Sequence, residues 1–195
     1  MTEDELVEKF VGHFERWFTI HREVYDENKI GRIDLILQDK ETDAVFGVEC
    51  KTPGKKRGND VGEVIQQAIQ YSRLTFFGKK IPIFLVPSIS HNQLSAPMER
   101  VMIEGIEWIR DKHHPEHRHH TVNGLLGNFN IGEVRRIPRT IKPFYDFVFS
   151  NKVIFTTKPA WGSERVQGLH KENYIELITK INQWEQTSRI FRTTP

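Results

Sequence analysis

The chain has 195 residues, of which 37% are hydrophobic and 28% are charged, and its formal net charge is +2. This composition excludes an intrinsically disordered chain, and the near-neutral charge means that any attraction to polyanions must come from local patches. A single cysteine excludes an intramolecular disulfide, and the absence of a long apolar run or a signal-peptide pattern predicts a soluble, cytoplasmic protein without a membrane partner.

The first predicted element is an amphipathic helix that begins after Thr2. Thr2 and Glu5 have the spacing of a capping box, and the acidic residues of the first turn suit the positive end of the helix dipole. Apolar side chains recur at helical spacing from Leu6 to Trp17, which predicts a face packed on a sheet. A weaker pattern over residues 19–25 indicates the first strand.

Two short segments rich in β-branched residues, 31–37 and 45–51, predict an antiparallel hairpin. Asp34 lies inside the first apolar run, while Glu49 and Lys51 are two residues apart and therefore point to the same side of their strand. Burying charged side chains is costly unless partners or a metal compensate. We therefore interpret these residues as a functional site, against the alternative of a salt-bridged pair on a solvated face.

These residue types suit metal-dependent cleavage of a phosphodiester bond. Two carboxylates from adjacent strands supply hard oxygen ligands for Mg²⁺ (or Mn²⁺), which also accepts waters and a substrate phosphate. A bound water can then serve as the nucleophile, and a lysine beside it supplies fixed positive charge. The sequence thus predicts Asp34 and Glu49 as metal ligands and Lys51 as a further catalytic residue.

A basic loop, a helix and a strand are predicted after the hairpin. Three basic residues lie in the loop: Lys55, Lys56 and Arg57. Their charge suits contacts with a nucleic-acid backbone, and an ordinary solvated loop is the alternative. Asp60 is the expected N-cap of a helix over 61–74, and a β-branched segment bounded by prolines predicts a buried strand over 81–87.

Asp34 followed by Glu49-x-Lys51 resembles the PD-(D/E)xK nuclease superfamily, with Ile33 standing where the family often has proline. The predicted order of helix, three strands, helix and strand over residues 3–87 is similar to the αβββαβ core of that family. The resemblance implies an α/β (α+β) fold with a restriction-endonuclease-like core, in which a mixed sheet is flanked by helices. It also implies a metal-dependent nuclease acting on DNA.

Further roles come from this resemblance alone. Gln67 and Tyr71 resemble the Q-x-x-x-Y motif of RecB-like branches, which implies that Gln67 supports the lysine strand and that Tyr71 approaches the DNA. The family often adds an acid from the first helix to the metal shell. Four acids compete for that role: Glu3, Glu5, Glu8 and Glu15. The first strand is expected to run back along the helix, which argues against Glu15, and Glu8 is our choice.

Residues 91–195 are predicted to form a C-terminal extension packed on the same domain as the 1–90 core. Three elements are expected there: a helix over 97–110, a hairpin with strands at 147–149 and 153–155, and a final helix over 171–189. The apolar face of the final helix suits a core contact or a homodimer contact.

Two clusters in the extension each allow two interpretations. Five of the eight residues over 113–120 are histidines, which suits either a zinc site or a polar surface loop. Four basic residues precede two aromatic residues, which suits either a nucleic-acid contact or ordinary surface charge. These are Arg135, Arg136, Arg139 and Lys142, followed by Phe144 and Tyr145.

The sequence therefore predicts a Mg²⁺-dependent deoxyribonuclease. One alternative is a catalytically inactive nucleic-acid-binding or assembly protein that retains the nuclease fold. Another is a zinc-organised interaction module built on the histidine-rich loop.

Overall fold

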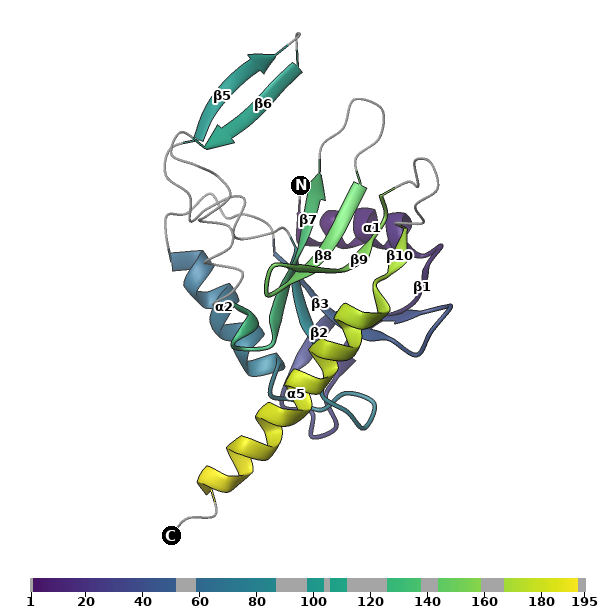
Figure 1. Ribbon diagram of the computed structural model, residues 1–195, viewed down its shortest axis with the longest axis vertical. Coiled ribbons are helices and arrows are strands. Elements are labelled where there is room, and N and C mark those ends of the chain that lie inside the picture. Colours follow the sequence, from purple (N-terminus) through teal and green to yellow (C-terminus); the bar gives the residue numbers. More distant parts are fainter. Residues whose placement is uncertain are drawn as a thin grey trace.

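The computed structural model describes residues 2–51, 59–86, 98–103, 106–111, 126–137, 144–158 and 167–192. These ranges contain an eight-stranded sheet, a separate two-stranded sheet and the helices α1, α2 and α5 (Figure 1). The helices are α1 (Glu3–Phe14), α2 (Asn59–Tyr71) and α5 (Lys171–Arg192). The predicted mixed α/β architecture is confirmed, whereas the restriction-endonuclease-like core stays a prediction.

The large sheet has the hydrogen-bonded order β1-β2-β3-β4-β7-β8-β9-β10. Its strands are β1 (Phe18–Tyr25), β2 (Arg32–Asp39), β3 (Val45–Cys50), β4 (Ile83–Val86), β7 (Ile131–Ile137), β8 (Phe144–Phe149), β9 (Lys152–Thr156) and β10 (Gly168–Leu169). Strands β3, β4 and β7 run parallel to one another, and the other neighbours pair antiparallel. The sheet is therefore mixed, with its parallel strands at the centre.

The first six elements occur in the predicted order of helix, three strands, helix and strand. Helix α1 begins with the expected capping box, in which Glu5 N donates to Thr2 Oγ1 at 3.2 Å and Thr2 N donates to Glu5 Oε2 at 2.9 Å. Helix α2 begins at Asn59, so Asp60 lies in its first turn instead of at the N-cap. The helix thus begins two residues before the predicted start at 61, a difference within the usual scatter of helix boundaries.

The predicted helix over 97–110 is wrong, because this region forms an antiparallel hairpin of β5 (Met98–Ile103) and β6 (Ile106–Asp111). Its register pairs Val101 with Trp108. Apolar residues alternate in the sequence on both sides of Glu104-Gly105, and this spacing of two residues is typical of a strand. The β-branched residues and the central glycine also favour a hairpin over a helix.

The later elements agree with the other predictions. Strands β8 and β9 form the expected hairpin, with φ angles of 46° at Ser150 and 66° at Asn151 in its turn. Two central residues with positive φ match the right-handed twist of paired strands. Helix α5 starts at the predicted Lys171. Because β4 pairs with β7, one sheet continues past residue 90, and the division of the chain there stays a prediction.

Two apolar clusters cover the two faces of the sheet. Helices α1 and α5 contribute Phe14 and Leu177 to one cluster, and α2 contributes Ala68 to the other (Figure 1). Val48 and Cys50 on β3 belong to the α1/α5 cluster. Since neighbouring residues of a strand point to opposite faces, the residue between them points toward the α2 face.

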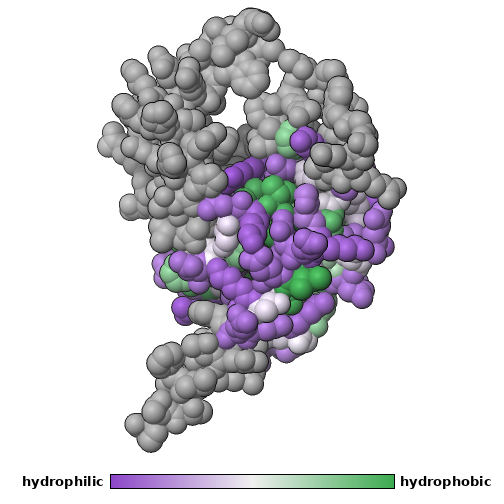
Figure 2. Space-filling model, in the orientation of Figure 1, coloured by the Kyte–Doolittle hydropathy of each residue, from purple (hydrophilic) through white to green (hydrophobic). Residues whose placement is uncertain are grey.

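Within the described ranges, no helix combines the length and the apolar character needed to cross a membrane. The face shown in Figure 2 is mostly hydrophilic where its residues are coloured.

Candidate functional site

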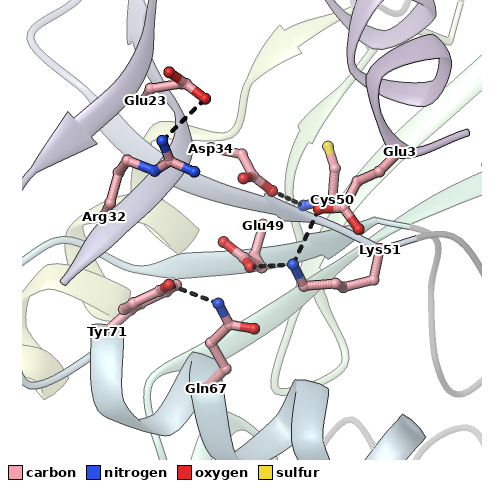
Figure 3. Close-up of polar contacts among 9 residues, drawn as sticks. All are labelled: Glu3, Glu23, Arg32, Asp34, Glu49, Cys50, Lys51, Gln67 and Tyr71. Atoms are coloured by element: carbon pink, nitrogen blue, oxygen red, sulfur yellow. Dashed lines mark hydrogen bonds and ion pairs between the residues drawn. The ribbon is translucent and has the colours of Figure 1, made fainter.

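The β2–β3 hairpin brings the two predicted acids together. Leu35 pairs with Val48 in the antiparallel ladder, so the next position along the strands places Asp34 beside Glu49 (Figure 3). Asp34 Oδ2 accepts a hydrogen bond from Cys50 N at 2.7 Å, which fixes this carboxylate against β3. Two carboxylates thus converge from neighbouring strands, as the sequence predicted.

The backbone opposite Asp34 is distorted. The β1–β2 ladder pairs Val24 with Ile33 and Arg22 with Leu35, but it skips Glu23 and Asp34. Glu23 has a φ angle of 48°, in the left-handed region that non-glycine residues rarely adopt. Such conformations gather at functional sites, where surrounding structure maintains them. Asp34 thus has no ladder partner on β1, and its side chain accepts its hydrogen bond from β3.

Glu49 is the most deeply buried member of the cluster, with 1% of its side chain exposed. Its Oε1 lies 3.0 Å from Lys51 Nζ in an ion pair, and its Oε2 has no hydrogen-bond partner among the described residues. Burial, and then the charge of Asp34, raise the pKa of Glu49 to about 7. Burial also raises the pKa of Asp34, with the Cys50 hydrogen bond acting in the opposite direction.

Lys51 is held between two carboxylates. Its Nζ lies 3.0 Å from Glu49 Oε1 and 3.1 Å from Glu3 Oε1 (Figure 3). Burial lowers the pKa of Lys51, but the charges and hydrogen bonds of Glu49 and Glu3 outweigh burial and raise it well above its usual range. The ammonium group therefore stays charged at neutral pH and cannot serve as a general base. It supplies a fixed positive charge beside the acids.

The structure places Glu3 beside Lys51, whereas Glu8, the predicted first-helix acid, lies elsewhere. Glu8 instead forms an exposed ion pair with Arg22 on β1. The two glutamates are five residues apart, and at 3.6 residues per turn they point in directions about 140° apart. Glu3 lies in the N-terminal half of α1, as expected from the return of the first strand along the helix, but the sequence did not determine which side of the helix faces β3.

Gln67 and Tyr71 lie on the α2 side of the cluster. Gln67 Nε2 donates to Tyr71 Oη at 2.6 Å (Figure 3). Burial raises the pKa of Tyr71, and the charges of Glu49 and Lys51 also act on it, so its hydroxyl lies within electrostatic reach of both. The hydrogen bond from Gln67 therefore fixes the orientation of the Tyr71 hydroxyl.

One basic residue beside the acids, Arg32, was not predicted from the sequence. Arg32 begins β2 and forms an ion pair with Glu23 in which the N–O distance is 3.2 Å. Burial raises the pKa of Asp34, and the charge of Arg32 is one of the smaller influences that oppose this rise. Its position two residues before Asp34 was the available signal. The predicted nucleic-acid contacts Lys55, Lys56 and Arg57 lie outside the described residues, as does the histidine-rich segment 113–120.

The acidic pair fits a divalent cation. Glu49 Oε2 is buried without a hydrogen-bond partner among the described residues, and Asp34 adds hard oxygens next to it. A cation would offset both carboxylate charges, whose mutual repulsion raises the pKa of Glu49. The described residues contain no group of three or more His, Cys, Asp or Glu placed to hold a metal. Mg²⁺ is usually bound through one or two carboxylates together with waters and substrate phosphate.

No protein-family model, no curated protein and no solved structure matches this chain.

Proposed function

We propose that this protein is a metal-dependent nuclease that hydrolyses DNA phosphodiester bonds. The observation that carries the proposal is Glu49, a buried carboxylate with an unpartnered oxygen beside Asp34 and an ion-paired lysine. An acid kept in this position destabilises the fold, which is expected of a residue retained for its chemistry. The resemblance of Asp34, Glu49 and Lys51 to the PD-(D/E)xK motif agrees with this chemistry.

In this proposal Asp34 and Glu49 would hold Mg²⁺ or Mn²⁺, and the bound cation would supply Lewis-acid activation of a water and of the scissile phosphate. The ammonium group of Lys51 supplies a fixed positive charge beside the two acids, which favours negative charge on the attacking oxygen and on the phosphate. Glu3 keeps Lys51 in place when the charge of Glu49 is shared with the cation. Tyr71 faces the same cluster and is oriented by Gln67.

Protonation of Glu49 opposes this function. Because its pKa is raised to about 7, a proton competes with the cation near neutral pH. Metal affinity and cleavage should therefore increase as pH rises through 7.

The test is incubation of the purified chain with single-stranded, double-stranded and branched DNA, and with RNA, in Mg²⁺ or Mn²⁺. Wild type is compared with Asp34→Asn and Lys51→Met. Asp4→Asn is a matched control, because Asp4 is an exposed acid in the first turn of α1. We expect cutting by wild type and the control, and loss of cutting in the two site variants.

Equal cutting by all variants would show that the activity belongs to another site or a contaminant. Cutting of RNA without DNA would refute the substrate assignment. Nucleic-acid binding without cutting under any of these conditions would favour the alternative, an inactive binding or assembly protein. One observation is compatible with an inactive protein: Lys51 is already ion-paired with two carboxylates, those of Glu3 and Glu49.

A further inference from the structure

Strand β7 repeats the charged pattern of β3. Glu133 and Arg135 are separated by one residue, as are Glu49 and Lys51. The parallel ladders pair Glu49 with Leu85 and Leu85 with Glu133, so the two glutamates lie in one row across three strands. Neighbouring strands are about 4.8 Å apart, so about 10 Å separates the two positions.

Both charged pairs face the same side of the sheet. Val134, between Glu133 and Arg135, belongs to the α1/α5 apolar cluster, so its two neighbours point to the α2 face. Lys51 N donates to Val86 O at 2.8 Å, so the β3–β4 pairing continues to the lysine. Arg135 and Lys51 therefore lie at the same end of the sheet, where the parallel strands have their carboxyl ends, and β4 lies between them. Ligands of open sheets commonly bind at such ends.

The guanidinium group of Arg135 is incompletely paired. Its side chain is 17% exposed, and its Nη2 lies 3.7 Å from Glu133 Oε2, which is too long for a hydrogen bond. Its Nε and Nη2 are buried and have no hydrogen-bond partner among the residues that the structure describes. Buried donors without an acceptor destabilise the fold, so these two nitrogens favour a ligand that supplies acceptors.

The neighbouring strand does not supply that acceptor. Asp146 on β8 stands directly opposite Arg135 in the ladder, but the Thr156 hydroxyl on β9 donates to Asp146 Oδ1. Lys158, His170 and Arg135 all act electrostatically on Asp146, so its negative charge is shared among several groups and is not committed to Arg135. Arg135 therefore keeps donors just beneath the surface, in a region with further positive charge.

We infer that Arg135 binds a backbone phosphate of the nucleic acid whose scissile bond lies at Asp34 and Glu49, an inference that rests on the proposed function. The planar guanidinium donates paired hydrogen bonds that match a phosphate group. A strand of nucleic acid that crosses the carboxyl ends of β3, β4 and β7 reaches both the acidic pair and Arg135. The phosphate meets the unpartnered donors that neither Glu133 nor Asp146 satisfies.

The experiment measures binding of fluorescently labelled single-stranded and duplex DNA by anisotropy, in EDTA and over a series of salt concentrations. The full chain is compared with Arg135→Gln and Arg135→Lys. Arg22→Gln is the matched control, because Arg22 is an exposed, ion-paired arginine on the edge strand β1. We expect Arg135→Gln to weaken binding and to reduce the slope of log K against log salt by about 0.9 for duplex or about 0.7 for single strands.

Arg135→Lys should keep this slope but bind more weakly than wild type, because lysine retains the charge without the paired donors. This variant also tests the inference if Arg135→Gln fails to fold in a thermal unfolding control. An unchanged slope in folded Arg135→Gln, or unchanged affinity in Arg135→Lys, would overturn the inference.

A second measurement separates nucleic acid from free phosphate. Inorganic phosphate should raise the melting temperature of wild type more than that of Arg135→Gln, because phosphate occupies the same donors. If phosphate does so while DNA affinity is independent of Arg135, the ligand is a small phosphate compound and the inference fails. Because binding is measured without metal, absence of DNA cutting would count against the proposed nuclease and would leave this result intact.

Discussion

Replacing Glu49 with glutamine should stabilise the metal-free protein at alkaline pH. The Glu49 side chain is 1% exposed, and burial together with Asp34 raises its pKa to about 7 from an ordinary value of 4.5. Between these values the native state binds more protons than the unfolded chain. Stability therefore falls as pH rises from about 4.5 to about 7, and the loss is complete above the native pKa. Glutamine has nearly the same shape and does not ionise.

The size of the effect follows from the two pKa values. One pH unit corresponds to about 1.4 kcal/mol, so the difference between 4.5 and about 7 amounts to about 3 kcal/mol in the free energy of unfolding. This value already includes the attraction of Lys51, which lowers the pKa of Glu49. Lys51 keeps Glu3 as a partner in the variant. About 3 kcal/mol is thus an upper limit for the gain.

The assay is urea unfolding of wild type and Glu49→Gln in EDTA at several pH values between 5 and 9. The difference should be small near pH 5 and approach its limit near pH 8. Glu176→Gln is a matched control, because Glu176 is an exposed glutamate paired with Lys152. Addition of Mg²⁺ should then stabilise wild type more than Glu49→Gln. A difference that does not vary with pH, or a variant less stable at pH 8, would refute the reasoning.

Three other predictions address the site and the hairpin that carries it. Glu3→Gln should lower DNA cleavage roughly tenfold, because it releases the site lysine, whereas Asp4→Asn in the same turn should not. Mg²⁺ affinity, measured calorimetrically, should increase from pH 5.5 to pH 8 as the buried glutamate loses its proton. Gly47→Ala should reduce the free energy of unfolding by about 1–3 kcal/mol, because its Cβ would lie 2.6 Å from an isoleucine methyl. Gly12→Ala, with nothing within 4 Å of its Cβ, should not destabilise the protein in the same urea titration.

Local sequence patterns predicted the elements that carry the proposed site. The capping box at Thr2 and the apolar alternation of β2 and β3 involve residues close together in the chain, so composition and spacing were sufficient. The pairing of Asp34 with Glu49 followed from one short hairpin. Over 97–110 the same approach failed, because the apolar residues satisfy both a helical and a strand period.

The sequence by itself determined the element order from α1 to β4 and the three charged residues of the hairpin, because short-range periodicity encodes both. Only the tertiary structure decided that Glu3, and not Glu8, contacts Lys51, since this depends on the rotation of α1 against the sheet. It also decided that Glu133 lies in the same row as Glu49. That alignment requires β4 to pair with both β3 and β7, a long-range arrangement that no local pattern specifies.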